Sequence, residues 1–320
     1  MLLVTGGNGF IATALGKGLK KTSLPFKLAA RQNSTDMIAV GDIGSFTDWS
    51  GALSGITTVI HLAGLAHRIA GPASLGEFRS VNVDGSVNLA RQAADSGVRR
   101  FVFVSSIAVL GQVTSAGQPF SDISPARPTT PYAVSKHEAE ESLKTLCSDL
   151  GMELVILRPP LVYGAEAPGN FGRLVQLVRS GYPLPLLSVR NRRSMVSIGS
   201  LSRALIACAT KEEAANQTFV VADKAPISTV GVVKAIARGL QTKERLFPFP
   251  VSMLQLALKA AGRTAIADGL LDSLEVDSSR IVSTLAWQPE PDTGRAIITQ
   301  LTANSGSSDG SDRPLPLRGQ

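Results

Sequence analysis

Short apolar runs alternate with helical patterns through the first half of the chain. Five runs are predicted to be strands: Leu2–Thr5, Phe26–Ala30, Thr58–Leu62, Phe101–Ser105 and Leu154–Arg158. Apolar residues recur at helical spacing between them, which predicts helices over Ile11–Lys20, Val81–Ser96 and Tyr132–Leu150. The strands are nearly all apolar, as strands are when helices cover both faces of a parallel sheet. The alternation predicts an α/β fold with a doubly wound parallel (Rossmann) sheet.

The pattern changes after Arg158, where five prolines interrupt the chain at 159, 160, 168, 183 and 185. A later apolar run, Thr218–Val221, predicts a last strand that returns to the sheet. We therefore expect residues 1–158 and about 190–223 to form the sheet domain. Residues of about 159–189 and 224–302 are expected to form a smaller, discontinuous C-terminal domain. The segment 303–320, rich in Ser, Gly, Asp, Pro and Arg, is predicted to be a disordered tail.

A glycine-rich turn follows the first strand and opens the first helix. It reads Thr5-Gly6-Gly7-Asn8-Gly9-Phe10-Ile11-Ala12. Gly6 permits a tight turn, Gly9 lets the backbone approach a pyrophosphate, and the helix N-terminus offers free N–H groups to the anion. Ala12 replaces the third glycine and is still small enough for close helix packing. The position of the turn between strand and helix predicts a dinucleotide site.

The end of the second strand bears on which dinucleotide is bound. An acidic residue there usually binds the ribose hydroxyls of NAD, but this chain has Ala30-Arg31. An arginine can pair with a 2′-phosphate, so Arg31 favours NADP(H), with NAD as the alternative. The other interpretation of Arg31 is a solvated surface side chain. Asp42 and Ile43 are assigned to the adenine edge, although Asp42 fits a loop cap equally well.

Tyr132 and Lys136 lie at i and i+4 near the start of a predicted helix, and so on one face of it. A phenol has a pKa near 10, and an ammonium group beside it, together with an oxidised nicotinamide, would lower that value. Tyr132 can then exchange a proton with an alcohol or a ketone. The alternative is an exposed pair without function, because this spacing also arises by chance. Ser106, at the carboxyl edge of the sheet, is placed to bind the reacting oxygen, whereas Ser105 fits a turn cap as well as a functional role.

Several further motifs occur in a fixed order along the chain. They are His61-Leu62-Ala63-Gly64, Asn82, Ser105-Ser106, Tyr132-x-x-x-Lys136 and Leu157-Arg158-Pro159-Pro160-Leu161-Val162-Tyr163-Gly164. With the glycine turn, this order resembles the extended short-chain dehydrogenase/reductases of the NAD-dependent epimerase/dehydratase family, which includes UDP-glucose 4-epimerase. The resemblance covers about residues 1–290.

The resemblance implies roles for individual residues and names the two domains. Ser106, Tyr132 and Lys136 would form the catalytic group, with Lys136 also holding the nicotinamide ribose. The sheet domain would bind the dinucleotide, and the smaller domain the substrate. Residues assigned to the cofactor are Gly6, Gly9, Phe10, Ile11, Arg31, Asp42, Ile43, Ala63, Gly64, Asn82, Ser105, Tyr132, Lys136 and Pro159.

The substrate side resembles the same family. Asn170-Phe171 and the run Arg190–Val196 are similar to segments that grip a UDP-sugar, and Arg193 would bind its pyrophosphate. The alternative for that run is a basic surface loop. The segment Leu285–Pro289 resembles the closing Leu-Gly-Trp-x-Pro signature of the family, with Ala286 in place of glycine, and is expected to be structural.

The catalytic group serves both a 4-ketoreductase and a 4-epimerase, and three departures from the epimerase pattern favour reduction. Arg31 suggests NADP(H), Ala66 stands where many 4-epimerases have lysine, and no clear counterpart of their late arginine precedes Asp277. Ser105-Ser106-Ile107 and the run Ser188–Ser194 resemble bacterial enzymes that reduce UDP-4-keto-6-deoxy-N-acetylglucosamine to UDP-N-acetylquinovosamine for surface polysaccharide. The alternative is a 4-epimerase of UDP-glucose or UDP-N-acetylglucosamine. A non-catalytic NADP-binding sensor is a remote alternative, since Tyr132 and Lys136 are intact.

Charge and composition narrow the class of partner. The net charge of +7 suits nucleic acid, an anionic membrane surface or phosphorylated small molecules. Because no nucleic-acid-binding motif accompanies it, we expect an anionic cofactor and substrate. No run of about 18 apolar residues predicts a membrane span. Val251–Ala261 is apolar apart from Gln255 and Lys259, and is expected to be a core or interface helix, with membrane contact as the alternative.

Cysteine and histidine usage bears on compartment and metal content. The two cysteines lie far apart, which predicts reduced thiols in a cytoplasmic protein. His61, His67 and His137 show no metal-ligand spacing, so no metal is predicted, and His61 is expected to be a packed structural residue. The resemblance suggests a homodimer through the helices Val81–Ser96 and Tyr132–Leu150.

Overall fold

A seven-stranded, all-parallel sheet forms the centre of the protein, in a computed structural model that describes residues 1–32, 36–66 and 73–306. The strand order is β3-β2-β1-β4-β5-β6-β9. The strands are β1 (Leu2–Thr5), β2 (Phe26–Ala30), β3 (Met37–Ala39), β4 (Thr58–His61), β5 (Arg100–Val104), β6 (Glu153–Arg158) and β9 (Thr218–Val220). The order reverses at β1, where the chain crosses to the other half of the sheet. The predicted doubly wound Rossmann fold is confirmed.

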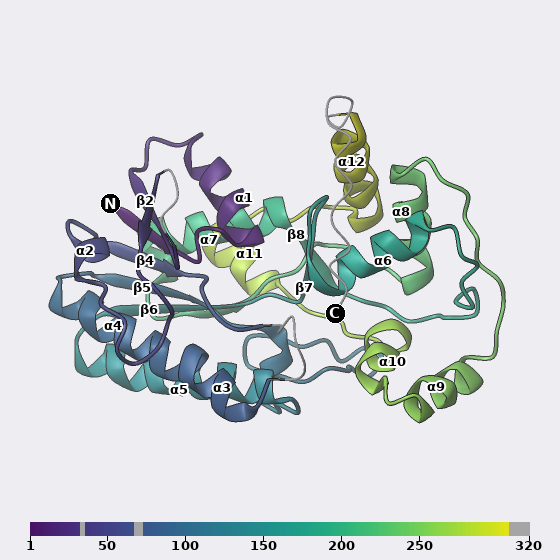
Figure 1. The fold of residues 1–320 in the computed structure, drawn as a ribbon, viewed down its shortest axis with the longest axis horizontal. Helices are drawn as coiled ribbons and strands as arrows, with labels where there is room; N and C mark the ends of the chain where they lie inside the picture. Colours follow the sequence, from purple (N-terminus) through teal and green to yellow (C-terminus); the bar gives the residue numbers. More distant parts are fainter. Residues whose placement is uncertain (33–35, 67–72, 307–320) are drawn as a thin grey trace.

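Helices cover both faces of this sheet (Figure 1). On one face lie α1 (Phe10–Leu19), α7 (Ile198–Thr210) and α11 (Ser279–Leu285), and on the other α2 (Ser50–Leu53), α4 (Gly85–Asp95) and α5 (Pro131–Asp149). Side chains alternate between the two cores, since Leu2 and Val4 join the first and Leu3 the second. Burial on both faces explains why the strands are almost entirely apolar.

A smaller lobe has its own core. It contains the two-stranded parallel sheet of β7 (Leu161–Tyr163) and β8 (Met195–Ser197), with α6 (Gly169–Arg179), α8 (Thr229–Gly239), α9 (Val251–Ala260), α10 (Thr264–Leu271) and α12 (Thr293–Gly306). The chain re-enters the larger lobe late, because Ile281, Leu285 and Trp287 pack into the sheet core. The segment 224–302, predicted as substrate domain throughout, is therefore shared between the two lobes.

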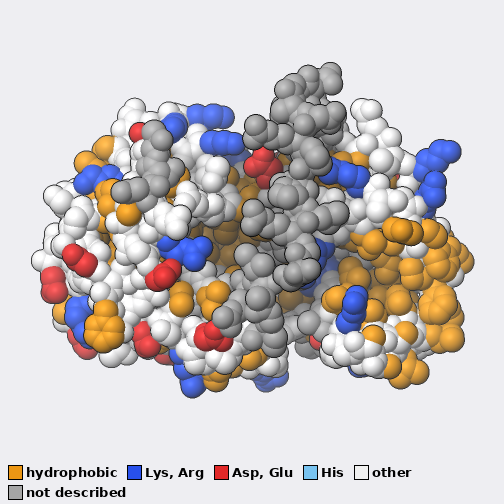
Figure 2. Space-filling view, in the orientation of Figure 1, with side chains coloured by type: hydrophobic (Ala, Val, Ile, Leu, Met, Phe, Trp, Pro, Cys, Tyr) orange, Lys and Arg blue, Asp and Glu red, His pale blue; other side chains and the backbone are white. Residues whose placement is uncertain are grey.

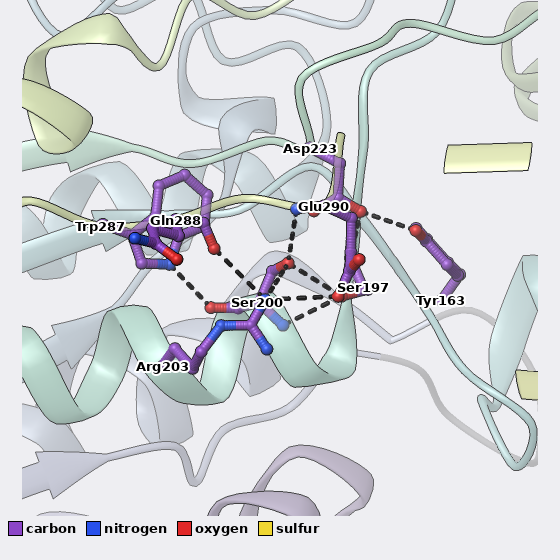
Figure 3. A network of polar contacts seen from close by, with 8 residues as sticks. All are labelled: Tyr163, Ser197, Ser200, Arg203, Asp223, Trp287, Gln288 and Glu290. Carbon is purple, nitrogen blue, oxygen red and sulfur yellow. Dashed lines mark hydrogen bonds and ion pairs between the residues drawn. The ribbon is translucent and has the colours of Figure 1, made fainter. Parts of the chain in front are cut away.

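Asp223 joins the lobes through a buried polar network (Figure 3). Its carboxylate accepts hydrogen bonds from the Tyr163 hydroxyl at 2.7 Å and from the Ser197 N–H at 2.8 Å. The Glu290 N–H donates to its other oxygen at 3.2 Å. Burial raises the pKa of Asp223, and these donors hold it back. Nearby, the Trp287 indole N–H donates to the Ser200 carbonyl, which anchors the closing signature as the structural element that was predicted.

Several local features differ from the sequence-based expectation. The predicted helix Val81–Ser96 is a π-helical turn over Ser80–Asp84 followed by α4. Strands β3, β7 and β8 were not predicted. Helix α12 runs through 303–306, which the prediction placed in the tail, and 307–320 lie outside the described residues. The segment Val251–Ala261, expected to be a core or interface helix, forms α9, which buries none of its residues fully but packs Val251, Leu254 and Leu258 against the core of the smaller lobe. Within the described ranges, no helix is long and apolar enough to cross a bilayer.

Candidate active site

The glycine turn between β1 and α1 brings backbone close to backbone. Gly6 has φ +72°, and a Cβ built on it would lie 3.1 Å from the Ala63 nitrogen after β4. Only glycine fits both constraints. Gly9 is the N-cap of α1, and within the described residues no side chain caps this helix end. The first turn carries no acidic residue, so its N–H groups and the positive end of the helix dipole suit an anion.

Thr5, at the tip of β1, starts a chain of buried hydrogen bonds. Its hydroxyl oxygen accepts from the N–H groups of Leu62 and Ala63, each at 3.1 Å. The hydroxyl proton is therefore directed to His61 Nδ1, 2.8 Å away. At the other side of the ring, His61 Nε2 lies 3.0 Å from Ser86 Oγ, and that hydroxyl donates to the Asn82 carbonyl at 2.7 Å. These partners assign His61 as the neutral Nε2–H tautomer.

Burial is the main reason that the imidazole stays neutral. His61 is 1% exposed, and desolvation with the nearby Lys136 charge lowers its pKa to about 3. The prediction that His61 is a packed structural residue fits this environment. The hydrogen bonds through His61 also tie β1, the loop after β4 and the π-helical turn together.

Asn82 extends this network to the catalytic helix. Its side chain holds Leu65 through two bonds, accepting from the Leu65 N–H at 2.8 Å and donating to the Leu65 carbonyl at 3.0 Å. The same amide donates to Ser135 Oγ at 3.0 Å, and Ser135 donates to the Tyr132 carbonyl at 2.8 Å. The π-helical turn brings Asn82 to this position. Asn82 therefore fixes the loop after β4 and the first turn of α5 relative to one another.

Tyr132 lies in the first turn of α5, where Thr130 caps the helix and Pro131 occupies its first position. Its ring packs edge-on against Phe78, with the centroids 6.0 Å apart. Burial raises the pKa of Tyr132, and a hydrogen bond from the Ser106 side chain offsets part of that rise. The expected lowering by Lys136 does not act in this geometry. The structure nevertheless brings Tyr132 and Ser106 within hydrogen-bond reach of one another, and their catalytic role stays a prediction.

Ser106 has a second contact that the sequence assigned elsewhere. Its Oγ accepts from the Ala108 N–H at 3.2 Å and so caps the short 3-10 turn after β5. The turn-capping role considered for Ser105 therefore belongs to Ser106. Ser105 Oγ is buried, and it has no hydrogen-bond partner within the described residues. A buried hydroxyl without a partner is costly, which indicates that a bound group completes it.

Lys136, one turn after Tyr132, is buried with its charge poorly solvated. Its Nζ lies 4.2 Å from the centroid of the Phe103 ring. Burial lowers the pKa of Lys136 to about 8, and the Glu140 carboxylate opposes that shift. A Cβ built on Gly64 would come within 3.0 Å of Asn82 Oδ1 and 3.8 Å of Lys136 Nζ. Gly64 therefore keeps the space in front of the ammonium group open.

A buried ion pair fixes the next turn of the same helix. Glu140 is fully buried and accepts from Arg158 at the end of β6 through two bonds, at 2.9 and 2.5 Å. This fork-to-fork geometry resists rotation of α5 about its axis.

His137 and Glu141 offer ligand atoms near Glu140. Both oxygens of Glu140 already serve Arg158, so this cluster carries no metal assignment, and the absence of a metal stays a prediction.

Part of the residues assigned to the cofactor follow the carboxyl ends of β1, β4 and β5, namely the glycine turn, Ala63 with Gly64, and Ser105. The uncapped start of α1, the close approach of Gly6 to Ala63, and the unpartnered hydroxyl of Ser105 all fit a dinucleotide lying across the strand ends. Pro159 is buried beside this edge, and its carbonyl accepts from the Ile107 N–H at 2.9 Å.

The outer cofactor residues occupy different surroundings. Arg31 and Asp42 are both exposed and lie 3.9 Å apart as an ion pair. Ile43 packs against Gly85, and Ile11 against the sheet core. Phe10 contacts Gly164 at the base of the smaller lobe, so its side chain has a packing role between lobes.

The two substrate residues lie in the smaller lobe. Asn170 is exposed in the first turn of α6. Arg193 is half-buried, and its Nη1 donates to the carbonyls of Asp268 and Asp272, at 3.2 and 2.8 Å. Burial lowers the pKa of Arg193. These two side-chain hydrogen bonds hold the guanidinium at the end of α10, and its role toward a pyrophosphate stays a prediction.

Sequence reasoning missed the residues that connect the site. Thr5, Ser86 and Ser135 were not singled out, although each bridges two predicted site segments. The bonds of these three residues to His61 and Asn82 span 56, 25 and 53 residues of the chain, so no local pattern marks them. The available signal was position, since Thr5 ends β1 and Ser135 lies between Tyr132 and Lys136.

Comparison with known proteins agrees with this arrangement. The profile of the NAD dependent epimerase/dehydratase family matches residues 2–222. A UDP-glucose 4-epimerase of Vibrio cholerae is 41% identical over 298 residues, which cover 90% of each chain. An N-acetyl-alpha-D-glucosaminyl-diphospho-ditrans,octacis-undecaprenol 4-epimerase of Escherichia coli O157:H7 is 26% identical over 262 residues, 79% of this chain and 77% of that one. The crystal structure of a Thermus thermophilus UDP-glucose 4-epimerase in complex with NAD aligns with a TM-score of 0.77, at 20% identity, over 96% of this chain and 99% of that one.

Proposed function

The chain belongs to the NAD dependent epimerase/dehydratase family, and on this premise we propose that it is an enzyme that moves a hydride at C4 of a nucleotide-diphosphate sugar. The observation that carries the proposal is the pairing of Tyr132 with Ser106 at the carboxyl end of β5, on the same edge of the parallel sheet as the uncapped start of α1. Ligands of doubly wound sheets bind at this edge, next to the point where the strand order reverses.

Each residue of the site has a distinct task in this proposal. A bound nicotinamide would supply or accept the hydride. Tyr132 exchanges a proton with the C4 oxygen of the sugar. Ser106 has a single hydroxyl proton, which it would turn from the phenol to the C4 oxygen when the sugar binds, so that it orients the reacting oxygen next to Tyr132. Lys136, held over Phe103, presents its positive charge to the ribose and favours the phenolate form of Tyr132 once both lie around the bound cofactor.

Within this class we propose reduction of a 4-keto sugar, of the type UDP-4-keto-6-deoxy-N-acetylglucosamine to UDP-N-acetylquinovosamine. Arg31 supports this choice, since an exposed guanidinium at the end of β2 suits the 2′-phosphate of NADP(H). Ala66, where many 4-epimerases have lysine, points the same way. A reductase consumes one reduced cofactor in each turnover and must release the oxidised form.

Epimerisation is the second candidate, and the comparison with the Vibrio cholerae UDP-glucose 4-epimerase favours it. The Escherichia coli relative is also named a 4-epimerase, of a diphosphate-linked sugar. An epimerase would return the hydride to the opposite face of the sugar and keep its NAD. Ser106, Tyr132 and Lys136 serve either reaction.

One experiment separates the two reactions. Purified protein is denatured and the released nucleotide is identified, and native protein is then incubated with UDP-glucose or with UDP-4-keto-6-deoxy-N-acetylglucosamine plus NADPH. The proposal predicts little retained nucleotide and oxidation of NADPH that depends on the keto sugar. Retained NAD, with conversion of UDP-glucose to UDP-galactose without added cofactor, would establish the epimerase instead. Inertness toward both sugars would revive the sensor alternative. The predicted homodimer and cytoplasmic location stay predictions.

A further inference from the structure

Helix α9 is apolar on the face that it turns to solvent. Met253, Leu256, Ala257 and Ala260 follow the spacing i, i+3, i+4, i+7 and therefore share one face, and all four are exposed. Met253 is 58% exposed and Leu256 70%. Surface helices of globular proteins normally turn polar side chains to water. This exposure is not scattered, because it follows a single helical stripe.

The opposite face of α9 already has its partner. Val251, Leu254 and Leu258 are half-buried against the core of the smaller lobe. The helix is thus apolar on both sides, and only the inner side is covered by the protein. Phe247, 40% exposed in the segment before the helix, extends the outer stripe. Figure 2 shows hydrophobic side chains gathered over this end of the smaller lobe, where Figure 1 places α9.

Cations flank the stripe at both ends. Lys243 and Arg245 precede the helix, Lys259 lies in its last turn and Arg263 follows it, and all four are exposed. The one acidic residue in 242–264, Glu244, is paired with Arg238 at 3.2 Å. Among the described residues, no carboxylate lies within ion-pair distance of the four cations. An apolar stripe with basic residues at its margins is the pattern of helices that lie in the interface of anionic bilayers.

We propose that α9 and the segment before it dock the protein on an anionic lipid bilayer, with Met253 and Leu256 entering the headgroup region. A second copy of the chain is a poorer occupant, because a two-fold contact through this stripe would bring two identical basic margins together. The helix would lie in the interface plane, which agrees with the finding that no described helix is long and apolar enough to cross a membrane.

Docking at α9 would bear on the substrate lobe. Helix α9 packs against α10, and the end of α10 accepts the hydrogen bonds of Arg193. The bilayer would therefore hold the element that fixes the predicted diphosphate-binding arginine. Binding of the protein to vesicles can be measured without turnover, so the test of this docking surface does not depend on which reaction the enzyme catalyses.

The test is co-sedimentation of the full-length protein with vesicles. One set contains phosphatidylcholine alone and the other phosphatidylcholine with phosphatidylglycerol, each at low and high salt. We expect binding to the anionic vesicles that weakens with salt, and little binding to the neutral ones. Leu256→Asp should weaken binding at least about tenfold, since a carboxylate would enter the apolar stripe beside anionic lipid. Replacing Lys243, Arg245, Lys259 and Arg263 by Gln should remove the salt dependence.

Two controls show whether a loss of vesicle binding is specific to the stripe on α9. Ile123→Asp changes an apolar residue that is even more exposed than Leu256, 88% against 70%, and lies outside α9 and its flanking segments, and this variant should bind like the wild type. Thermal unfolding of each variant checks that it is folded. Absence of binding to anionic vesicles at low salt would overturn the proposal. So would equal loss in Ile123→Asp, or a change of sedimentation coefficient in Leu256→Asp without vesicles, which would identify the stripe as a contact between copies.

Discussion

The hydroxyl of Thr5 donates a hydrogen bond to His61 Nδ1 across the tips of β1 and β4, at 2.8 Å. Because the same oxygen accepts from two backbone N–H groups, its proton has one direction to point. That contact sets the tautomer of His61, which sets the bond to Ser86 and so the position of the π-helical turn. The π-helical turn then holds Asn82 against the start of α5, the helix that carries Tyr132.

The buried, neutral His61 in this series of hydrogen bonds predicts that acid destabilises the fold. His61 has a pKa of about 3 when folded and near 6.5 when unfolded, so the unfolded chain binds an extra proton between these values. The free energy of unfolding should therefore fall as pH drops from 6.5, by about 1.4 kcal/mol per unit from this group. His61→Gln should be less stable at pH 7 but should show a shallower dependence in urea titrations at pH 7, 6 and 5. An unchanged slope in His61→Gln would contradict the neutral assignment.

The buried ammonium group of Lys136 is expected to lower the stability of the fold although activity requires it. Its pKa is about 8 when folded and 10.5 when unfolded, so burial of the charge opposes folding below pH 8. Between pH 8 and 10.5 the unfolded chain binds more protons, and this opposition is relieved as pH rises. Lys136→Met should therefore unfold at a higher temperature than the wild type at pH 7, with a difference that shrinks toward pH 10.5, while activity is lost. A variant that is destabilised at pH 7 would show that the ammonium group is a net stabilising contact.

The buried pair of Glu140 and Arg158 should be costly to break. Glu140→Ala leaves the Arg158 guanidinium buried without its partner, which costs about 3–5 kcal/mol in comparable pairs. Glu141→Ala on the same helix removes only an exposed pair with Lys144, worth about 1 kcal/mol or less. Denaturant unfolding of both variants checks the contrast. Equal losses would mean that helix propensity, not the buried pair, accounts for the effect.

Arg31 should decide between the two dinucleotides. Arg31→Ala removes the cation proposed to face the 2′-phosphate, and we expect KM for NADPH to rise about tenfold, with little change for NADH. The matched control is Arg99→Ala, because Arg99 is also exposed but directly precedes β5, at the amino ends of the strands and away from the predicted cofactor site. If the wild type already prefers NADH and Arg31→Ala changes neither KM, Arg31 is a surface residue paired with Asp42, and the NADP(H) assignment fails.

The parts of the fold that could be predicted are those with local signals. The strands β1, β2, β4, β5 and β6 are largely apolar runs, and most of their residues are buried because helices cover both faces. By contrast, β3 is only three residues long and lies half-exposed at the sheet edge, so no apolar run marks it. The strands β7 and β8 pair with each other across more than 30 residues, which periodicity cannot reveal.

The candidate site divides in the same way. Gly6, Tyr132 and Lys136 stand in short motifs, and the sequence predicted where they lie. The Asn82–Ser135 bond spans 53 residues, and it exists only because a π-helical turn aims one side chain at α5. For α9 the sequence left core, interface and membrane contact open, because an apolar helix has the same pattern in a core and at a surface.

The central claim is that Tyr132 carries the proton while a dinucleotide lies across the strand ends. It is tested most directly by kcat/KM for the keto sugar in wild type and Tyr132→Phe, with dinucleotide affinity measured on the same samples. We predict a loss of about 10²–10⁴-fold in kcat/KM in a variant that still binds the dinucleotide, because the aromatic ring stays in place and the proton carrier is removed. Activity within a few-fold of the wild type in Tyr132→Phe would contradict the account.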